Sequence, residues 1–159
     1  MTDSERQLAA ALGRVPSGIF VLTVQRDAIE TGMLASWVQQ CSFRPPQISI
    51  AVQRERPVAA LLTPGSAFTL NVLDATQTDM IGHFGRGFDL NQPAFAGLDV
   101  LRGESNGPIL SEALAYLTCE VANCCPAGDH DLFIGTVVAG RVLGEGQPMV
   151  HVRKSGMHY

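Results

Sequence analysis

The chain has 159 residues, 46% hydrophobic and 16% charged, proportions typical of one globular domain with a sizeable core. No apolar run approaches the ~20 residues that cross a bilayer, and residues 1–15 lack the apolar stretch of a secretory signal. The formal net charge of −4 argues against general nucleic-acid binding, which requires a basic surface. We therefore expect a single soluble, cytoplasmic domain over residues 1–159 that binds neither nucleic acid nor membrane.

Ten arginines accompany one lysine. This bias suits bidentate recognition of phosphates or carboxylates, but a GC-rich genome, which also favours Ala and Gly, is the better explanation of the bias as a whole and leaves individual arginines as candidates. The four cysteines include an adjacent pair but no C-x-x-C spacing, so we expect neither a disulfide nor a metal site. The four histidines are scattered and have few carboxylates nearby, which also disfavours a metal centre.

A first helix is predicted from Ser4, an N-cap whose capping box Gln7 completes, to about Val15, before Pro16. The apolar residues 17–25 predict a strand that is covered on both faces.

A hairpin connection over residues 26–32 leads into "GMLASWVQQCSFRPP", residues 32–46. This segment has the apolar content of a strand, but it does not alternate and ends in two prolines.

Residues 47–53 alternate and predict a further strand. A short helix is expected over 56–65, with Pro57 in its first turn. A strand over 66–73 and a helix over 75–85, capped by Thr76, follow.

Residues 86–97 form a loop long enough to suggest a functional surface, and a short strand is expected over 98–103. Two long strands, 113–125 and 131–143, are joined by a turn rich in Gly, Pro and Asp. A last strand covers 148–154.

These elements predict a mainly β protein with two or three short helices. The strands do not alternate with long helices, which disfavours a doubly wound parallel sheet. A closed or nearly closed antiparallel barrel fits best, because closure removes exposed strand edges. The G-x-G-x-x-G, P-loop, H-E-x-x-H and G-x-S-x-G motifs are all absent.

Polar and aromatic groups gather instead at strand ends and connections, and each has an ordinary structural explanation. A turn histidine is more often a capping group than a catalyst, arginines between strand and helix are usually solvated, and phenylalanines four residues apart usually pack together. The candidates are Asp129 and His130, Arg54 and Arg56, Phe84, Arg86 and Phe88, and Arg153, His158 and Tyr159.

Five segments together resemble the flavin reductase family, the FMN-binding split barrel: "SGIFVLTV", "GMLASWVQQCSFRPPQISIAVQRERP", "AFTLNVL", "GDHDLFIGTV" and "VHVRKSGMHY". "LASW" and the C-terminal segment are most similar to the flavin reductase module at the C-terminus of cyanobacterial flavodiiron proteins (diflavin flavoproteins). The resemblance runs from about Leu8 to Tyr159. It implies an antiparallel split barrel of Greek-key type that binds FMN or FAD and takes electrons from NAD(P)H.

The resemblance also implies where the flavin ring lies. It places the ring against Met33, Leu34, Ala35, Ser36 and Trp37. A flat ring with a polar edge needs small side chains and unpaired backbone N–H groups, and we expect Gly32, Ala35 and Ser36 to supply the room.

The remaining site residues follow from the resemblance in the same way. Ser42 and the segment from Gln53 to Pro57 match positions near the ribityl chain and phosphate, with Arg54 or Arg56 binding the phosphate. This chain has Glu-Arg-Pro where many relatives have Ser or Thr. Phe84, Arg86 and Phe88 match a region that touches the far part of the nucleotide. Arg153 and Tyr159 match the pocket rim.

His130 matches the histidine of the family's "GDH" hairpin, and we expect it to orient the substrate or stabilise charge rather than to act as an obligatory base. The predicted reaction is hydride transfer from NAD(P)H to flavin, an electron-transport step that supplies the flavodoxin-like and diiron domains of a flavodiiron protein. A homodimer is implied. Two alternatives stay open: a flavin-binding or assembly module without turnover, and a haem-binding split barrel that uses His83, His130, His151 or His158.

Overall fold

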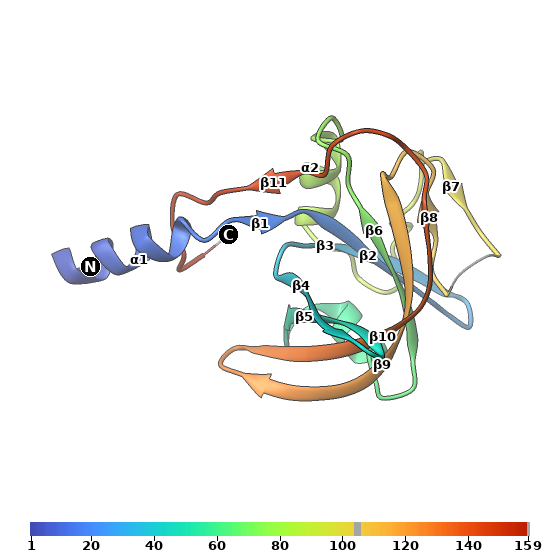
Figure 1. Cartoon of the computed structure of the whole chain (residues 1–159), viewed down its shortest axis with the longest axis horizontal. Coiled ribbons are helices and arrows are strands. Elements are labelled where there is room, and N and C mark those ends of the chain that lie inside the picture. Colours follow the sequence, from blue (N-terminus) through green and yellow to red (C-terminus); the bar gives the residue numbers. More distant parts are fainter. Residues whose placement is uncertain (104–105, 159) are drawn as a thin grey trace.

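The computed structural model describes residues 1–103 and 106–158 (Figure 1). It is built almost entirely of antiparallel strands, with two α-helices and one 3-10 helix in the described part. The elements are α1 Asp3–Gly13, β1 Ser17–Gly18, β2 Phe20–Arg26, β3 Ile29–Ala35, β4 Val38–Phe43, β5 Pro46–Gln53, η1 Pro57–Leu61, β6 Ala67–Val72, α2 Asp79–Gly85, β7 Val100–Leu101, β8 Ile109–Leu110, β9 Ala115–Ala127, β10 His130–Val142 and β11 Val150–His151.

Seven strands form one sheet in the order β3-β2-β6-β9-β10-β5-β4. Strands β3 and β4 follow each other in the chain, yet they occupy the two opposite edges of the curled sheet. The chain crosses from one edge to the other through Ser36 and Trp37, which belong to neither strand. The sheet is therefore an open, split barrel, which confirms the predicted mainly β, antiparallel split-barrel fold class; β3 and β4 are not paired with each other.

The interior of the barrel is apolar because the strands alternate inward and outward side chains. In β5, Ile48, Ile50 and Val52 are buried while the residues between them are partly exposed. They pack with residues such as Phe68 and Phe133 in the main core cluster. A second cluster joins the outer face of β2 to α2 and the loop that follows it, and it includes Val21, Met80, Phe84 and Phe95.

The two ends of the chain lie together outside the barrel (Figure 1). Strand β1 pairs with β11, with Ser17 opposite His151, and α1 projects beyond this ribbon. The capping box of α1 is formed by Thr2 and Glu5, not by the expected Ser4 and Gln7. The helix ends at Gly13, before Pro16.

Other elements are shorter than the sequence predicted. The strand predicted over 17–25 is interrupted at Ile19, whose N–H binds Met149 O. The C-terminal strand is only two residues long, and helix α2 begins after Thr78 rather than Thr76.

No helix among the described residues has the length and hydropathy needed to span a membrane.

Candidate flavin pocket at the barrel split

A pocket of about 230 Å³ opens where the barrel is split. Its floor is the end of β3, from Met33 to Ala35, continued by Ser36. Strand β5 supplies Ala51 and Gln53 opposite, helix α2 supplies Ile81 and Gly85, and β11 with the residues after it supplies His151 and Arg153. Segments that lie far apart in sequence meet here because the sheet edges fail to join.

The floor offers backbone hydrogen-bonding groups. Strand β3 pairs with β2 along one side, from Phe20 opposite Ala35 onward, and no strand of the described residues pairs with its other side. An edge strand of this kind leaves part of its N–H and C=O groups unpaired. The irregular segment of residues 32–46 thus contains the crossing, at Ser36 and Trp37, between the two edges of the sheet.

Gly32 serves a different purpose from the one expected. A Cβ atom at Gly32 would lie 3.1 Å from Phe84 and 3.2 Å from Phe95, so this glycine permits core packing rather than the approach of a ligand. Gly85 is the glycine that opens on the pocket, since a Cβ there would meet only Leu34, at 3.7 Å.

The pocket wall carries positive charge and no negative charge. Arg56 and Arg153 line it, together with His151, and no Asp or Glu does so. Arg56 forms no ion pair within the described part of the chain. In a protein with a net charge of −4, this lining favours an anionic ligand.

A second cavity, of about 410 Å³, adjoins the first through Gln53 and Arg56; its lining contains Arg86 and Phe88 and also two acidic residues, Glu55 and Asp89. Gly87 has a φ of 77°, and a Cβ there would lie 2.7 Å from Arg56 Nη1, so only glycine lets Arg56 keep this position. Together the cavities fall within the ~300–1,000 Å³ typical of ligand sites.

Three of the predicted residues, Arg153, Trp37 and His130, contact one another in series at the edge of the pocket. The Arg153 guanidinium lies 5.0 Å from the centre of the Trp37 ring, a cation–π distance. Trp37 also contacts His130, with 4.8 Å between ring centres and the ring planes tilted by 44°. His130 is 6% exposed and donates from Nδ1 to Asp129 Oδ1 at 2.7 Å, which lowers the pKa of the Asp129 carboxyl. Neither His130 nor Trp37 is among the residues that line the pocket.

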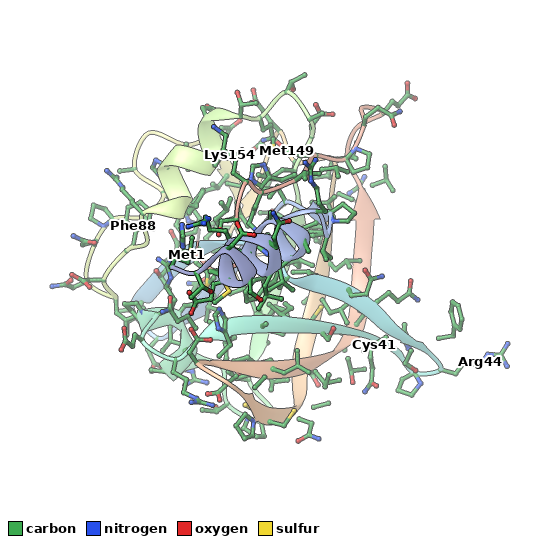
Figure 2. The ribbon with its side chains drawn as sticks, turned by 90° about the vertical axis from the view of Figure 1, so that its left-hand side faces the viewer. Met1, Cys41, Arg44, Phe88, Met149 and Lys154 are labelled. Carbon is green, nitrogen blue, oxygen red and sulfur yellow. The ribbon has the colours of Figure 1, made fainter. Side chains whose placement is uncertain are left out.

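The structure separates several other predicted residues from the pocket. Arg54 binds Asp131 through Nε at 2.9 Å and the His130 carbonyl through Nη2 at 3.1 Å, so it secures the β9–β10 turn. Ser42 lies between Cys41 and Arg44 on the β4–β5 hairpin, which extends away from the barrel (Figure 2). Phe84 is a core residue with 1% exposure. Tyr159 lies outside the described residues.

Sequence reasoning assigned no pocket role to His151, Ile81 or Gly85. His151 could have been predicted as a pocket residue from its spacing to Arg153. The two are two residues apart in the predicted last strand, and alternate residues of a strand share a face. Among the other haem candidates, His83 Nε2 lies 2.7 Å from Ala94 O, and its ring packs against Phe88. This is the setting of a structural histidine.

An antiparallel split barrel with a cationic, partly apolar pocket at its open edge suits an anionic ligand with an apolar part, such as a nucleotide. The family model described as "Flavin reductase like domain" matches residues 12–158. The chain therefore belongs to the flavin reductase-like domain family. This confirms the predicted family and, with it, the prediction of a flavin-dependent oxidoreductase.

Individual relatives agree with this assignment. The chain is 38% identical to diflavin flavoprotein A 1 of Synechocystis sp., over 98% of this chain but 27% of that protein, so it spans about a quarter of the curated relatives it matches. The NADH:FAD oxidoreductase SgcE6 of Streptomyces globisporus superposes with a TM-score of 0.84 at 27% identity, covering 94% of this chain and 88% of that one. BorF, the flavin reductase component of a bacterial two-component tryptophan halogenase, gives 0.81 at 26% identity, covering 99% and 97%.

Proposed function

We propose that this chain is an NAD(P)H-dependent flavin reductase that holds FMN or FAD in the pocket at the barrel split. The observation that carries the proposal is the pocket lining: an unpaired strand edge, apolar side chains and two arginines, with no acid. A flavin nucleotide has the matching properties, namely a flat apolar ring with a polar edge and an anionic tail. SgcE6 has been solved in complex with NAD and FAD fragments, which supports the same use of this fold.

The residues present fit a flavin. The free edge of β3 from Met33 to Ser36 would bind the polar rim of the ring, and Gly85 leaves the opposite wall open. Arg56 would bind the phosphate, because it lines both the pocket and the adjoining cavity and carries no competing ion pair among the described residues. Arg86 would extend this grip.

A bound flavin supplies a two-electron acceptor for the hydride of NAD(P)H. The protein has to hold the two rings at ~3–3.5 Å and exclude water, and the apolar side chains of Met33, Leu34 and Ile81 suit both tasks. Arg153, whose side chain lines the pocket, would stabilise the negative charge that reduction adds. His130 contributes indirectly, by supporting the Trp37 ring.

Two further parts of the proposal concern partners. Relatives named diflavin flavoproteins contain this module within longer chains, which supports electron delivery to flavodoxin-like and diiron domains. A homodimer is supported by the exposed apolar residues of the projecting N-terminal segment: Leu8 on α1 is 56% exposed, and Val15, just after α1, is 59% exposed. A second copy would cover them. A cytoplasmic location stays a prediction.

Purified protein titrated with FMN and with FAD, then supplied with NADH or NADPH, tests the proposal. We expect quenching of flavin fluorescence on binding and oxidation of the nicotinamide that depends on flavin. Binding without oxidation would instead support the module without turnover. An absence of binding to both flavins would refute the proposal.

A further inference from the structure

A basic cavity adjoins the pocket through Arg153, and it shares no residue with the cavity that adjoins the pocket through Gln53 and Arg56. It has a volume of about 320 Å³ and is lined by Ala10, Arg14, Val152, Arg153 and Lys154. Three of these five residues are cations and none is an acid. Lys154 is the only lysine of the chain, and Arg153 belongs to both this cavity and the central pocket.

The two segments that form the cavity are held tightly together. Gly156 N–H donates to Ala9 O at 2.7 Å. A Cβ at Gly13 would lie 2.6 Å from Arg153 O, so the C-terminal segment rests directly on the last turn of α1. The Arg153 side chain is fixed further by the Trp37 ring. The cations from the helix and from the tail are therefore brought together by the fold and are not a chance feature of two mobile ends.

Two nucleotides that react in one pocket require separate space for their anionic tails. Both reactive rings must meet in the central pocket, while the anionic tails repel each other and leave most easily by opposite flanks. The proposed function, on which this inference rests, assigns the flank of Arg56 and Arg86 to the flavin phosphate. The flank of Arg14 and Lys154 is then available to the nicotinamide nucleotide.

We infer that Arg14 and Lys154 bind the 2′-phosphate of NADPH and make the protein prefer NADPH to NADH. A 2′-phosphate is dianionic or nearly so at neutral pH, and it has several acceptor oxygens for ammonium and guanidinium groups. Both side chains are exposed, so their attraction is screened by solvent and salt. Their combined effect is expected to be moderate, at about three- to tenfold.

The test compares kcat/KM for NADPH and NADH in the wild type, Arg14→Met, Lys154→Met and the double variant. We expect the NADPH/NADH ratio to fall about three- to tenfold in the double variant, with kcat at saturating NADPH unchanged, because only ground-state binding is lost. The control is Arg44→Met, which removes an exposed arginine at the far hairpin (Figure 2) and should leave the ratio unchanged. An equal loss for both nucleotides, or no loss, would overturn the inference.

A binding measurement separates this inference from the proposed function. Calorimetry with adenosine 2′,5′-bisphosphate and adenosine 5′-monophosphate needs no turnover, and the first should bind more tightly only when Arg14 and Lys154 are present. If no nicotinamide is oxidised but this difference persists, the reductase proposal fails and the phosphate site stands. If turnover is normal and the two ligands bind equally, the phosphate site fails alone.

Discussion

Replacing Arg56 with Gln tests the flavin phosphate site most directly. Arg56 is partly buried, faces two connected cavities and makes no ion pair in the described part of the chain. A hydrogen bond to a charged group contributes ~1.5–3 kcal/mol, and each ~1.4 kcal/mol is a factor of ten in affinity. We therefore expect the Kd for FMN to rise about ten- to a hundredfold, and the fold to be unaffected.

Riboflavin, which lacks the phosphate, makes the assay specific. The Kd values of FMN and riboflavin are measured by fluorescence quenching for the wild type and for Arg56→Gln. The wild type should prefer FMN, and the variant should lose most of that preference while its riboflavin affinity stays similar. Equal weakening for both ligands would show that Arg56 supports the pocket in some other way.

The matched variant is Arg54→Gln. Arg54 pairs with Asp131 at a site where both side chains are partly exposed, 45% and 28%, and such pairs contribute ~0–1 kcal/mol. We expect its FMN affinity to change by less than about fivefold. A larger loss of FMN preference in Arg54→Gln than in Arg56→Gln would refute the assignment of the phosphate to Arg56.

Three further changes test the fold. Gly82→Ala should raise the unfolding free energy by ~0.5–1 kcal/mol, seen as a higher Tm, because a Cβ there meets nothing within 4 Å; a lower Tm would contradict this. Burial raises the pKa of the Cys119 thiol to about 12, so a thiol reagent at pH ~8 should modify the other three cysteines of the native protein, all exposed, and reach Cys119 only after unfolding. Hydrogen bonds from the backbone N–H and the hydroxyl of Thr76 lower the pKa of the Asp74 carboxyl. The ionised carboxylate therefore stabilises the folded state in full above the pKa of an unfolded Asp, ~3.9. This stabilisation is lost as the pH falls through the lower pKa of the folded state. Asp74→Asn should therefore lower the urea midpoint of unfolding at neutral pH, and the midpoint of the variant should fall less than that of the wild type as the pH is lowered. If the two midpoints fall equally in acid, Asp74 does not have this role.

The regular parts of the fold were predictable from local pattern. The long strands β9 and β10 and the turn between them follow from continuous apolar stretches flanking Gly and Asp. The ends of the chain were harder to predict, since β1 and β11 are two residues long and exist only because each pairs with the other. Pairing between residues more than a hundred positions apart leaves no local signal.

The residues of the candidate pocket were predicted only in part, because contacts between distant segments leave no local signal in the sequence. The segment from Met33 to Ser36 is unusual in composition, and it proved to be the pocket floor. Arg54 and Arg56 could not be distinguished, because residues two apart share a face in a strand but not across the turn that follows β5. That turn directs Arg54 to the β9–β10 hairpin and Arg56 to the pocket. Ser42 matches the family pattern, yet the β4–β5 hairpin carries it outward.

The position of the pocket follows from the way the sheet fails to close. An open edge strand is normally a liability, because its unpaired backbone groups attract other strands. Here the chain places two consecutive strands on opposite edges, with only Ser36 and Trp37 between them, so the edges remain close but unpaired. The residues at this edge, from Met33 to Ser36, line the pocket. A flat ligand with a polar rim would satisfy the backbone groups that the split leaves unpaired, so we expect the feature that prevents closure of the barrel also to create its binding site.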